Sequence, residues 1–272
     1  MTLCWIDGQP ASQLSVKDRG LAYGDGFFET ILVKAGKPLL FDGHLQRLAL
    51  TGKRLAFSLD LLLVESECRA FASQMQEGVM KLIITRGDGL RGYAPTPGAR
   101  GLRILQASPL PAYPPSNAEQ GVRLYPCQTR LAEQPLLAGL KHLNRLEQVL
   151  ARNEWHDAEH AEGLMRDTSG RIVEAVYSNL FMVKGGVLLT PDLSRCGVAG
   201  VMRAELLALA EDANMPVRAL DLQMSDLRKA DEVFVCNSVY GIWPVRAFEQ
   251  LIWPVGAVTR KLQHLVRGLL DI

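Results

Sequence analysis

Apolar and polar positions alternate in short blocks along the first hundred residues, and these blocks predict strands followed by helices. The segments LCWIDG and FFETILVKAGKPLLF have strand character, the second with a hairpin turn at residues 34–37. Asp42 is expected to cap a helix through GHLQRLALTGKRLAF, in which leucines recur on one face. A second helix is expected over about residues 61–76, and VMKLIITRG and LRILQAS return to strand.

The strongest break in the pattern is the segment SPLPAYPPSNAEQG, residues 108–121, which contains four prolines. Proline is excluded from helix interiors and from central strands, so this segment is expected to be a linker. The predicted organisation is therefore an N-terminal domain over residues 1–107 and a C-terminal domain over residues 122–272.

The second part of the chain mixes strand patterns with helical patterns near residues 142–155, 201–213 and 258–270. Gly185-Gly186 is typical of a hairpin turn between two strands. Strands and helices alternate in both parts without a regular βαβ rhythm. An α+β fold with mixed sheets is therefore favoured over a Rossmann or barrel fold.

Composition narrows the class of protein further. Hydrophobic residues make up 48% and charged residues 22% of the 272 positions, which are globular values, and the net charge is +1. A net charge this close to zero is not typical of proteins that bind nucleic acid, which usually carry an excess of basic residues. No apolar run has the length of a signal peptide or a membrane span, so a soluble, cytoplasmic protein is expected. The five cysteines are scattered and never spaced C-x-x-C, which argues against disulfides and structural zinc.

For two short motifs we favour a purely structural interpretation over a functional one. The Gly-x-Gly turns in YGDGFFET and RGDGL do not continue into a nucleotide-binding pattern, so tight turns are expected. His156 and His160, four residues apart in EWHDAEHAE, would share one face of a helix and could hold zinc. The run is very polar and is not H-E-x-x-H, so a solvated helix end is favoured and no metal is expected.

Three charged residues are stronger candidates, and for each the sequence leaves two interpretations open. Lys141 lies in the lead-in to a predicted helix, in LLAGLKHLNRLEQVLAR, and is either a surface lysine or a reactive one. His44 and Arg47, one turn apart, are either a surface pair or place Arg47 in a cleft to bind an anion. Glu174, in the strand pattern RIVEAVYSNLFMV, either faces water or is paired inside.

The segment CGVAGVMRAELLALAEDA, residues 196–213, has the local pattern of an anion site. Its glycines allow a tight turn that opens directly into a helix, whose first amides are unpaired and whose dipole favours negative charge. The segment VFVCNSVYG ends a buried-type strand in Asn237-Ser238, small polar groups that could add donors to a phosphate.

Taken in order, these motifs resemble those of a known family. H-x-x-R-L is followed by the lysine, a glutamate in an N-L-F strand, G-V-x-G-V-M-R and finally C-N-S, and the likeness runs from WIDG to NSVYGIWPV. The order and spacing resemble the fold-type IV pyridoxal-phosphate enzymes, which include D-amino-acid and branched-chain aminotransferases and 4-amino-4-deoxychorismate lyases. The stretches GLKHLNRLEQVLAR and RGDGLRGY most resemble the lyases.

The resemblance implies a role for each candidate residue. Lys141 would form the covalent bond to pyridoxal 5'-phosphate (PLP) and later shuttle a proton, and Glu174 would hold the pyridine nitrogen protonated. The cofactor phosphate would be bound by the side chains or backbone amides of Arg47, Val201, Met202 and Ser238. Arg91 and Tyr93, in LRGY, match the family's loop for the substrate carboxylate.

The resemblance also implies an architecture and a reaction. Two α/β domains would hold the cofactor in the cleft between them, and the protein would work as a homodimer. A lyase would convert 4-amino-4-deoxychorismate to 4-aminobenzoate and pyruvate for folate synthesis, with Lys141 removing the C4 proton. The alternative is an aminotransferase of the same fold. Leu146 stands where branched-chain aminotransferases often have tyrosine, whereas Glu29 matches their frequent acid. A non-catalytic protein that only binds an anion is a further alternative, disfavoured because it needs no such lysine.

Overall fold

The computed structural model describes residues 3–95 and 101–270. By its internal contacts the chain divides into unit 1, Met1–Pro111 with Leu140–Asn144, and unit 2, Ala112–Gly139 with Arg145–Ile272. The change from one unit to the other falls inside the proline-rich segment 108–121, which also contains a short helix, α4 (Ser116–Glu119). Because residues 140–144 return to unit 1, Lys141 lies in unit 1, whereas the sequence had placed it in the C-terminal domain.

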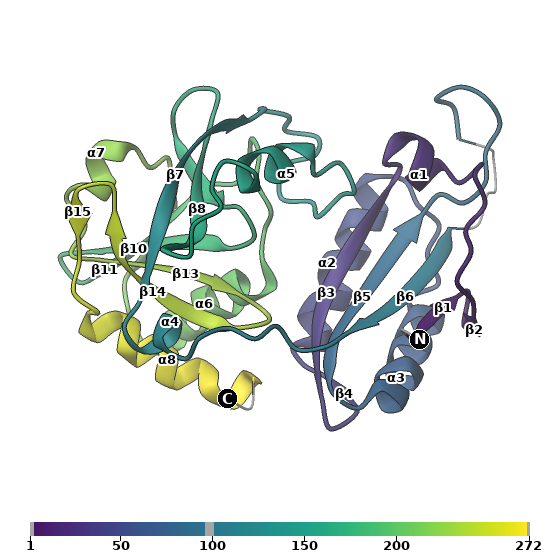
Figure 1. Cartoon of the computed structure of the whole chain (residues 1–272), viewed down its shortest axis with the longest axis horizontal. Coiled ribbons are helices and arrows are strands. Elements are labelled where there is room, and N and C mark those ends of the chain that lie inside the picture. The colour runs from purple at the N-terminus through teal and green to yellow at the C-terminus, as the bar shows by residue number, and fades with distance from the viewer. Residues whose placement is uncertain (1–2, 96–100, 271–272) are drawn as a thin grey trace. The chain divides into compact units, whose positions relative to one another are not determined.

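Unit 1 is built on an antiparallel six-stranded sheet with the order β2-β1-β6-β5-β3-β4 (Figure 1). Its strands are β1 (Cys4–Ile6), β2 (Gln9–Pro10), β3 (Gly26–Lys34), β4 (Lys37–Pro38), β5 (Gly78–Thr85) and β6 (Leu102–Ser108). Its helices are α1 (Arg19–Tyr23), α2 (Phe41–Arg54) and α3 (Leu61–Met75). The hairpin predicted at residues 34–37 is confirmed as the turn between β3 and β4.

The core of unit 1 lies between the sheet and helices α2 and α3. Alternation along β3 directs Phe27, Ile31 and Val33 into this core, together with side chains of β5 and both helices. Glu29 lies between Phe27 and Ile31 in the same alternating series of positions. Its carboxylate therefore points toward the apolar core, on the same side of the sheet as those side chains. Phe28, next to it in the chain, points to the opposite face of the sheet.

The start of α2 differs from the prediction. Asp42 lies in the first turn of the helix, and the N-cap is Leu40, whose φ of +51° is left-handed. The prediction of Asp42 as N-cap is therefore wrong, although its charge still suits the positive end of the helix dipole. Helix α3 begins as its sequence indicates, because the Asp60 carboxylate accepts the Leu63 N–H at 3.1 Å.

Unit 2 is built on a nine-stranded mixed sheet with the order β12-β11-β10-β13-β14-β7-β8-β9, and β15 pairs with β14. The strands are β7 (Val122–Leu131), β8 (His160–Asp167), β9 (Ile172–Ala175), β10 (Asn179–Lys184), β11 (Val187–Pro191), β12 (Val217–Leu220), β13 (Glu232–Asn237), β14 (Gly241–Phe248) and β15 (Leu251–Ile252). Besides α4, the helices are α5 (Leu146–Arg152), α6 (Val201–Asp212), α7 (Met224–Leu227) and α8 (Ala257–Leu270).

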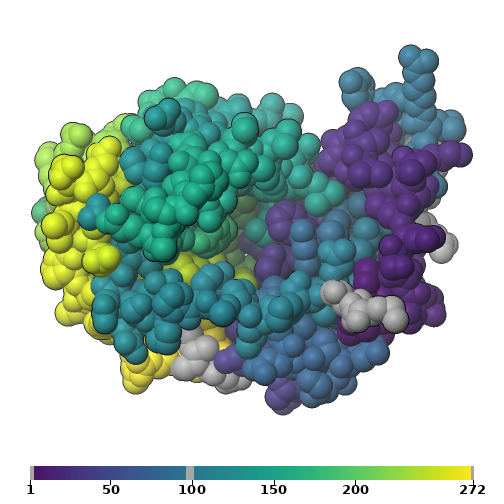
Figure 2. All heavy atoms as spheres, viewed as in Figure 1, coloured from purple at the N-terminus to yellow at the C-terminus, as the bar shows by residue number. Residues whose placement is uncertain are grey.

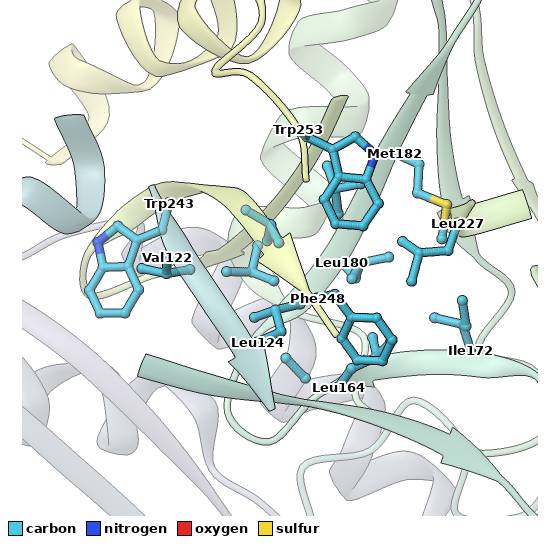
Figure 3. Packing of buried hydrophobic residues seen from close by; sticks show 14 of the residues in the cluster. Val122, Leu124, Leu164, Ile172, Leu180, Met182, Leu227, Trp243, Phe248 and Trp253 are labelled. Atoms are coloured by element: carbon cyan, nitrogen blue, oxygen red, sulfur yellow. The ribbon is translucent and has the colours of Figure 1, made fainter. Parts of the chain in front are cut away.

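The main core of unit 2 gathers side chains from several strands of this sheet. Figure 3 shows Phe248 and Trp253 lying close to Leu180 and Met182 of β10, within one apolar cluster. Strand β7 is parallel to both of its neighbours, β8 and β14, whereas β10, β11 and β13 form antiparallel pairs. Both units are α+β, as the sequence predicted, but only the sheet of unit 2 is mixed, because every strand pair of unit 1 is antiparallel. In the part of the chain that is described, no helix is long and apolar enough to span a bilayer.

Two elements of unit 2 differ from the predicted ones. The pattern RIVEAVYSNLFMV forms two strands, β9 and β10, because residues 176–178 turn between them. The buried carboxylate of Glu162 accepts the Ser178 hydroxyl at 2.7 Å and the Tyr177 N–H at 3.3 Å, which holds this turn. The helix expected over 142–155 is shorter, because α5 begins only at Leu146 and ends at Arg152.

Candidate active site

Lys141 lies in an extended segment that runs along the edge of β3. The Phe28 N–H donates to the Lys141 C=O at 3.0 Å, and the Leu143 N–H donates to the Gly26 C=O at 3.0 Å. This pairing keeps residues 141–143 out of α5 and fixes the backbone that carries the lysine. The Lys141 Nζ lies 4.5 Å from the centroid of the Phe28 ring, a cation–π distance. The half-buried lysine is therefore held beside an aromatic face of unit 1.

On the core side of β3, Glu29 forms a buried cluster with two residues of α2. The Arg47 Nε donates to Glu29 Oε1 at 2.8 Å, and the Arg47 Nη2 donates to Oε2. The His44 Nδ1 lies 2.6 Å from Glu29 Oε2. The side chains of Glu29 and His44 are 2% and 1% exposed and that of Arg47 is 10% exposed, so the surface-pair interpretation of His44 and Arg47 is wrong.

Burial and the contacts within the cluster determine the charges of Glu29 and His44. Burial raises the pKa of the Glu29 carboxyl, but the Arg47 charge and the hydrogen bonds from Arg47 and His44 outweigh it and lower that pKa to about 2. Burial lowers the pKa of His44 below its usual value, against the opposing pull of Glu29. At neutral pH, Glu29 is therefore an anion and His44 is neutral. Because a carboxylate only accepts, the His44 proton lies on Nδ1.

Of this cluster the sequence assigned only Arg47 to a site, and gave no site role to His44 or Glu29. The sequence feature that could have indicated Glu29 is a single charged residue at an inward position of an otherwise apolar strand, FFETILV. The spacing of His44 and Arg47, one helical turn apart, places both on the face of α2 that packs on β3. Only the packing of α2 on the sheet shows that the carboxylate and these two side chains meet.

Arg91 and Tyr93 lie in the exposed loop after β5. The blue atoms beside purple α1 at the upper right of Figure 2 include this loop. Arg19 of α1, itself buried, donates through Nη1 to the Gly92 C=O at 3.0 Å and through Nη2 to the Tyr93 C=O at 2.7 Å. Its Nε donates to Asp25 at 2.9 Å. One guanidinium therefore fastens the backbone of the loop that carries both predicted substrate residues.

Glu174 is buried in unit 2, and the interpretation that it faces water is wrong. Its side chain is 3% exposed, and its Oε2 accepts the Val198 N–H at 2.8 Å. The Gln148 amide donates to Oε1 at 3.4 Å. Gly197 makes this approach possible, because its φ of +85° is left-handed and a Cβ there would lie 2.7 Å from a Val173 methyl. Hydrogen bonds of this kind favour the charged carboxylate.

Val201 and Met202 form the first turn of α6. The first helical bond runs from the Ala204 N–H to the Gly200 C=O, so the amides of residues 201 and 202 lie outside the helix's own ladder. The loop before them is shaped by Asn179, whose side chain accepts the Gly200 N–H at 3.1 Å and donates to the Val198 C=O at 2.8 Å. These two amides therefore lie at the positive end of the helix dipole.

Ser238 lies in the turn after β13. The Asn237 carboxamide oxygen accepts the N–H groups of Val239 and Tyr240 at 2.9 and 3.0 Å, which closes the turn over Ser238. Within unit 2, Asn237 therefore determines the position of the predicted phosphate ligand, as Asn179 does for the loop before α6.

The two histidines of the polar run do not lie on a helix. His156 lies in the irregular segment between α5 and β8, and His160 begins β8 with its Nδ1 2.8 Å from Asp157 Oδ1. The expected solvated helix end is therefore wrong in its secondary structure. Among the residues that the structure describes, no group of three or more histidine, cysteine, aspartate or glutamate side chains could hold a metal ion.

Comparison with known proteins identifies the family. A model of the amino-transferase class IV family matches residues 26–248, which is most of the chain. The chain belongs to the class IV aminotransferase family. The predicted resemblance is thereby confirmed, and the class IV match accounts for the motifs from FFET in β3 to the end of β14.

Relatives within the class IV family include lyases and aminotransferases. The chain is 36% identical to the aminodeoxychorismate lyase of Vibrio harveyi, over 95% of this chain and 97% of that protein. The solved structure of 4-amino-4-deoxychorismate lyase from Pseudomonas aeruginosa is 60% identical, with a TM-score of 0.98 over 99% of this chain and 100% of that one.

The branched-chain amino acid aminotransferase of Escherichia coli has a TM-score of 0.85 at 28% identity, over 98% of this chain and 94% of that one. The class IV likeness thus extends to enzymes of both reaction types. These structures confirm the predicted α+β fold of the fold-type IV class.

Proposed function

We propose that this chain is a PLP-dependent aminodeoxychorismate lyase, which converts 4-amino-4-deoxychorismate to 4-aminobenzoate and pyruvate in folate biosynthesis. The observation that carries the proposal is the 60% identity to a solved lyase over nearly the full length of both chains. The identity to the solved aminotransferase is 28%, about half that value. We also propose that the protein acts in the cytoplasm as a homodimer, as the family resemblance implies.

The residues present fit PLP part by part. A buried carboxylate, Glu174, whose Oε2 accepts the Val198 N–H, matches a protonated pyridine nitrogen. The amides at the start of α6, with Ser238 and Arg47, match a phosphate. Lys141, held beside the Phe28 ring, is a primary amine of the kind that bonds to the cofactor aldehyde.

The side chains of this protein have separate tasks in the proposed reaction. PLP, when bound, supplies an electron sink for the carbanion that forms at C4 of the substrate. Lys141 Nζ takes the proton from C4, which requires the uncharged amine. Glu174, itself buried, would hold the ring nitrogen protonated through an ion pair.

Arg91 and Tyr93 are proposed to orient the substrate through its carboxylate. Arg19 holds the loop backbone through the carbonyl groups of residues 92 and 93, so the loop is ordered before substrate arrives. Such pre-ordering lowers the entropic cost of binding and aligns the C4–H bond for proton removal.

The experiment that tests the proposal measures both products at once. Purified protein loaded with PLP is given freshly prepared 4-amino-4-deoxychorismate, and 4-aminobenzoate and pyruvate are followed in parallel. Equimolar formation of the two is expected. Protein reduced with borohydride, which locks the bond between Lys141 and the cofactor, is the control and is expected to form neither.

A different outcome would favour the aminotransferase alternative. A yellow, cofactor-loaded protein that forms neither product, but transfers an amino group from an amino acid to a 2-oxo acid, would overturn the lyase proposal. A protein that stays colourless with added PLP would overturn the cofactor assignment as well.

A further inference from the structure

The cluster of Glu29, His44 and Arg47 has a geometry beyond what charge neutralisation requires. Glu29 receives two parallel N–H donors from one edge of the Arg47 guanidinium, through Nε and Nη2. A single oxygen contact would neutralise the charge, whereas this forked pairing also fixes the plane of the guanidinium. His44 binds the same carboxylate at 2.6 Å and so limits its rotation.

We propose that Glu29 is a positioning residue, which with His44 orients the Arg47 guanidinium for the phosphate group of the cofactor. This inference rests on the proposed function, because it takes Arg47 as a phosphate ligand. Glu29 itself contacts neither cofactor nor substrate in this proposal.

Burial explains why the orientation persists. Glu29 and His44 are almost fully buried, and Arg47 nearly so, so water does not compete strongly for their hydrogen bonds. A free arginine side chain samples many rotamers, and this freedom is lost when a ligand orders it. Here the forked bond fixes the guanidinium before any ligand arrives, and binding does not have to supply that ordering.

Charge argues for an orienting role rather than simple attraction. Glu29 is anionic and His44 neutral, so Glu29 cancels the charge of Arg47 and weakens its long-range pull on a phosphate. If net attraction were the purpose of the site, removing Glu29 would strengthen phosphate binding. If orientation dominates, removing Glu29 weakens it. The two effects have opposite signs, and an affinity measurement separates them.

Glu29→Gln is the decisive variant. A carboxamide has one acceptor oxygen and one donor nitrogen, so it cannot accept both Arg47 N–H groups while also accepting the His44 N–H. Glu29→Asp is the second variant, because it keeps the charge but withdraws the carboxylate by one methylene. Glu65→Gln is the control, since it removes a carboxylate from an exposed pair with Arg69 on α3.

The measurement compares PLP with pyridoxal, which lacks the phosphate, by equilibrium titration of the cofactor-free proteins. In both Glu29 variants the affinity for PLP is expected to fall about tenfold or more, the equivalent of one charge-assisted hydrogen bond, with pyridoxal affinity unchanged. Equal losses for both compounds would show a merely structural role, and unchanged or tighter PLP binding would show that orientation does not matter. Either result overturns the proposal.

A double-mutant cycle separates this inference from the proposed function. Arg47→Lys keeps the charge but loses the forked geometry, and is expected to lower the PLP affinity relative to pyridoxal. Adding Glu29→Gln to it is expected to cause no further loss in that ratio. A ratio unaffected by Arg47→Lys would overturn the phosphate role of Arg47 and the inference with it. Wild-type protein that binds no PLP would instead overturn the proposed function.

Discussion

Replacing Glu29 by glutamine should also reveal how much the buried cluster stabilises unit 1. In the native state the pKa of Glu29 lies at about 2, compared with an ordinary value of 4.5. At about 1.36 kcal/mol per pH unit, this difference corresponds to a contribution of about 3 kcal/mol at neutral pH. Breaking a buried ion pair from one side costs about 3–5 kcal/mol, because the other charge is left unpaired. Both routes predict a loss of about 3 kcal/mol.

The pH dependence follows from the sign of the shift. Because the native pKa is lowered, the Glu29 contribution is complete above about pH 4.5 and is lost as the pH falls toward about 2. The difference in unfolding free energy between wild type and Glu29→Gln is therefore expected to shrink from about 3 kcal/mol at pH 7 to about 2 kcal/mol at pH 3.5. Other carboxyl groups titrate alike in both proteins and cancel in the difference.

Urea denaturation of the cofactor-free proteins, followed by circular dichroism at several pH values, measures this difference. Hydrogen exchange at pH 7 should locate the loss of protection in α2 and β3. Glu65→Gln on the exposed face of α3 is expected to cost about 0.5 kcal/mol or less. A Glu29→Gln protein as stable as wild type at pH 7, or a difference that does not narrow on acidification, would refute the reasoning.

Three further substitutions test the candidate active site. Lys141→Ala is expected to fold normally by circular dichroism and to form neither 4-aminobenzoate nor pyruvate; normal turnover would remove the lysine from the mechanism. Gly197→Ala is expected to lower the unfolding free energy by about 1–3 kcal/mol, since φ is left-handed and the added Cβ crowds Val173. Urea denaturation measures that loss, and unchanged stability would contradict the crowding. Arg19→Lys is expected to raise the substrate KM severalfold at unchanged PLP affinity, because an ammonium cannot replace the guanidinium's bonds to the loop carbonyls. Steady-state kinetics decides this, and an unchanged KM would count against a role for the loop in substrate binding.

Features that depend on near neighbours in the chain could be predicted from the sequence. Asp60 caps α3 because its side chain bonds to an amide three residues on, and Gly185-Gly186 turns between β10 and β11 because glycine accepts left-handed backbone. The start of α6 is equally local, as are the alternating strands of both sheets. The ordered motifs also sufficed to recognise the family.

Features that depend on distant segments were set by the tertiary structure. His142 and Leu143 stay out of α5 because residues 141–143 pair with the edge of β3, and that pairing overrides the helix expected from residue 142. Leu40, an apolar residue with left-handed backbone, takes the N-cap of α2 that Asp42 was expected to hold.

The charged groups show the same limit most clearly. Sequence alone identified Arg47 and Glu174 as candidates, but it could not say whether either was buried or what it bound. Glu29 meets Arg47 only because α2 packs on the inner face of β3, and Glu174 meets the Val198 amide only through a loop from another part of the chain. Hydrophobic periodicity and helix capping depend on a few neighbouring residues. The partner of a buried charge instead depends on which distant segment of the chain packs against it.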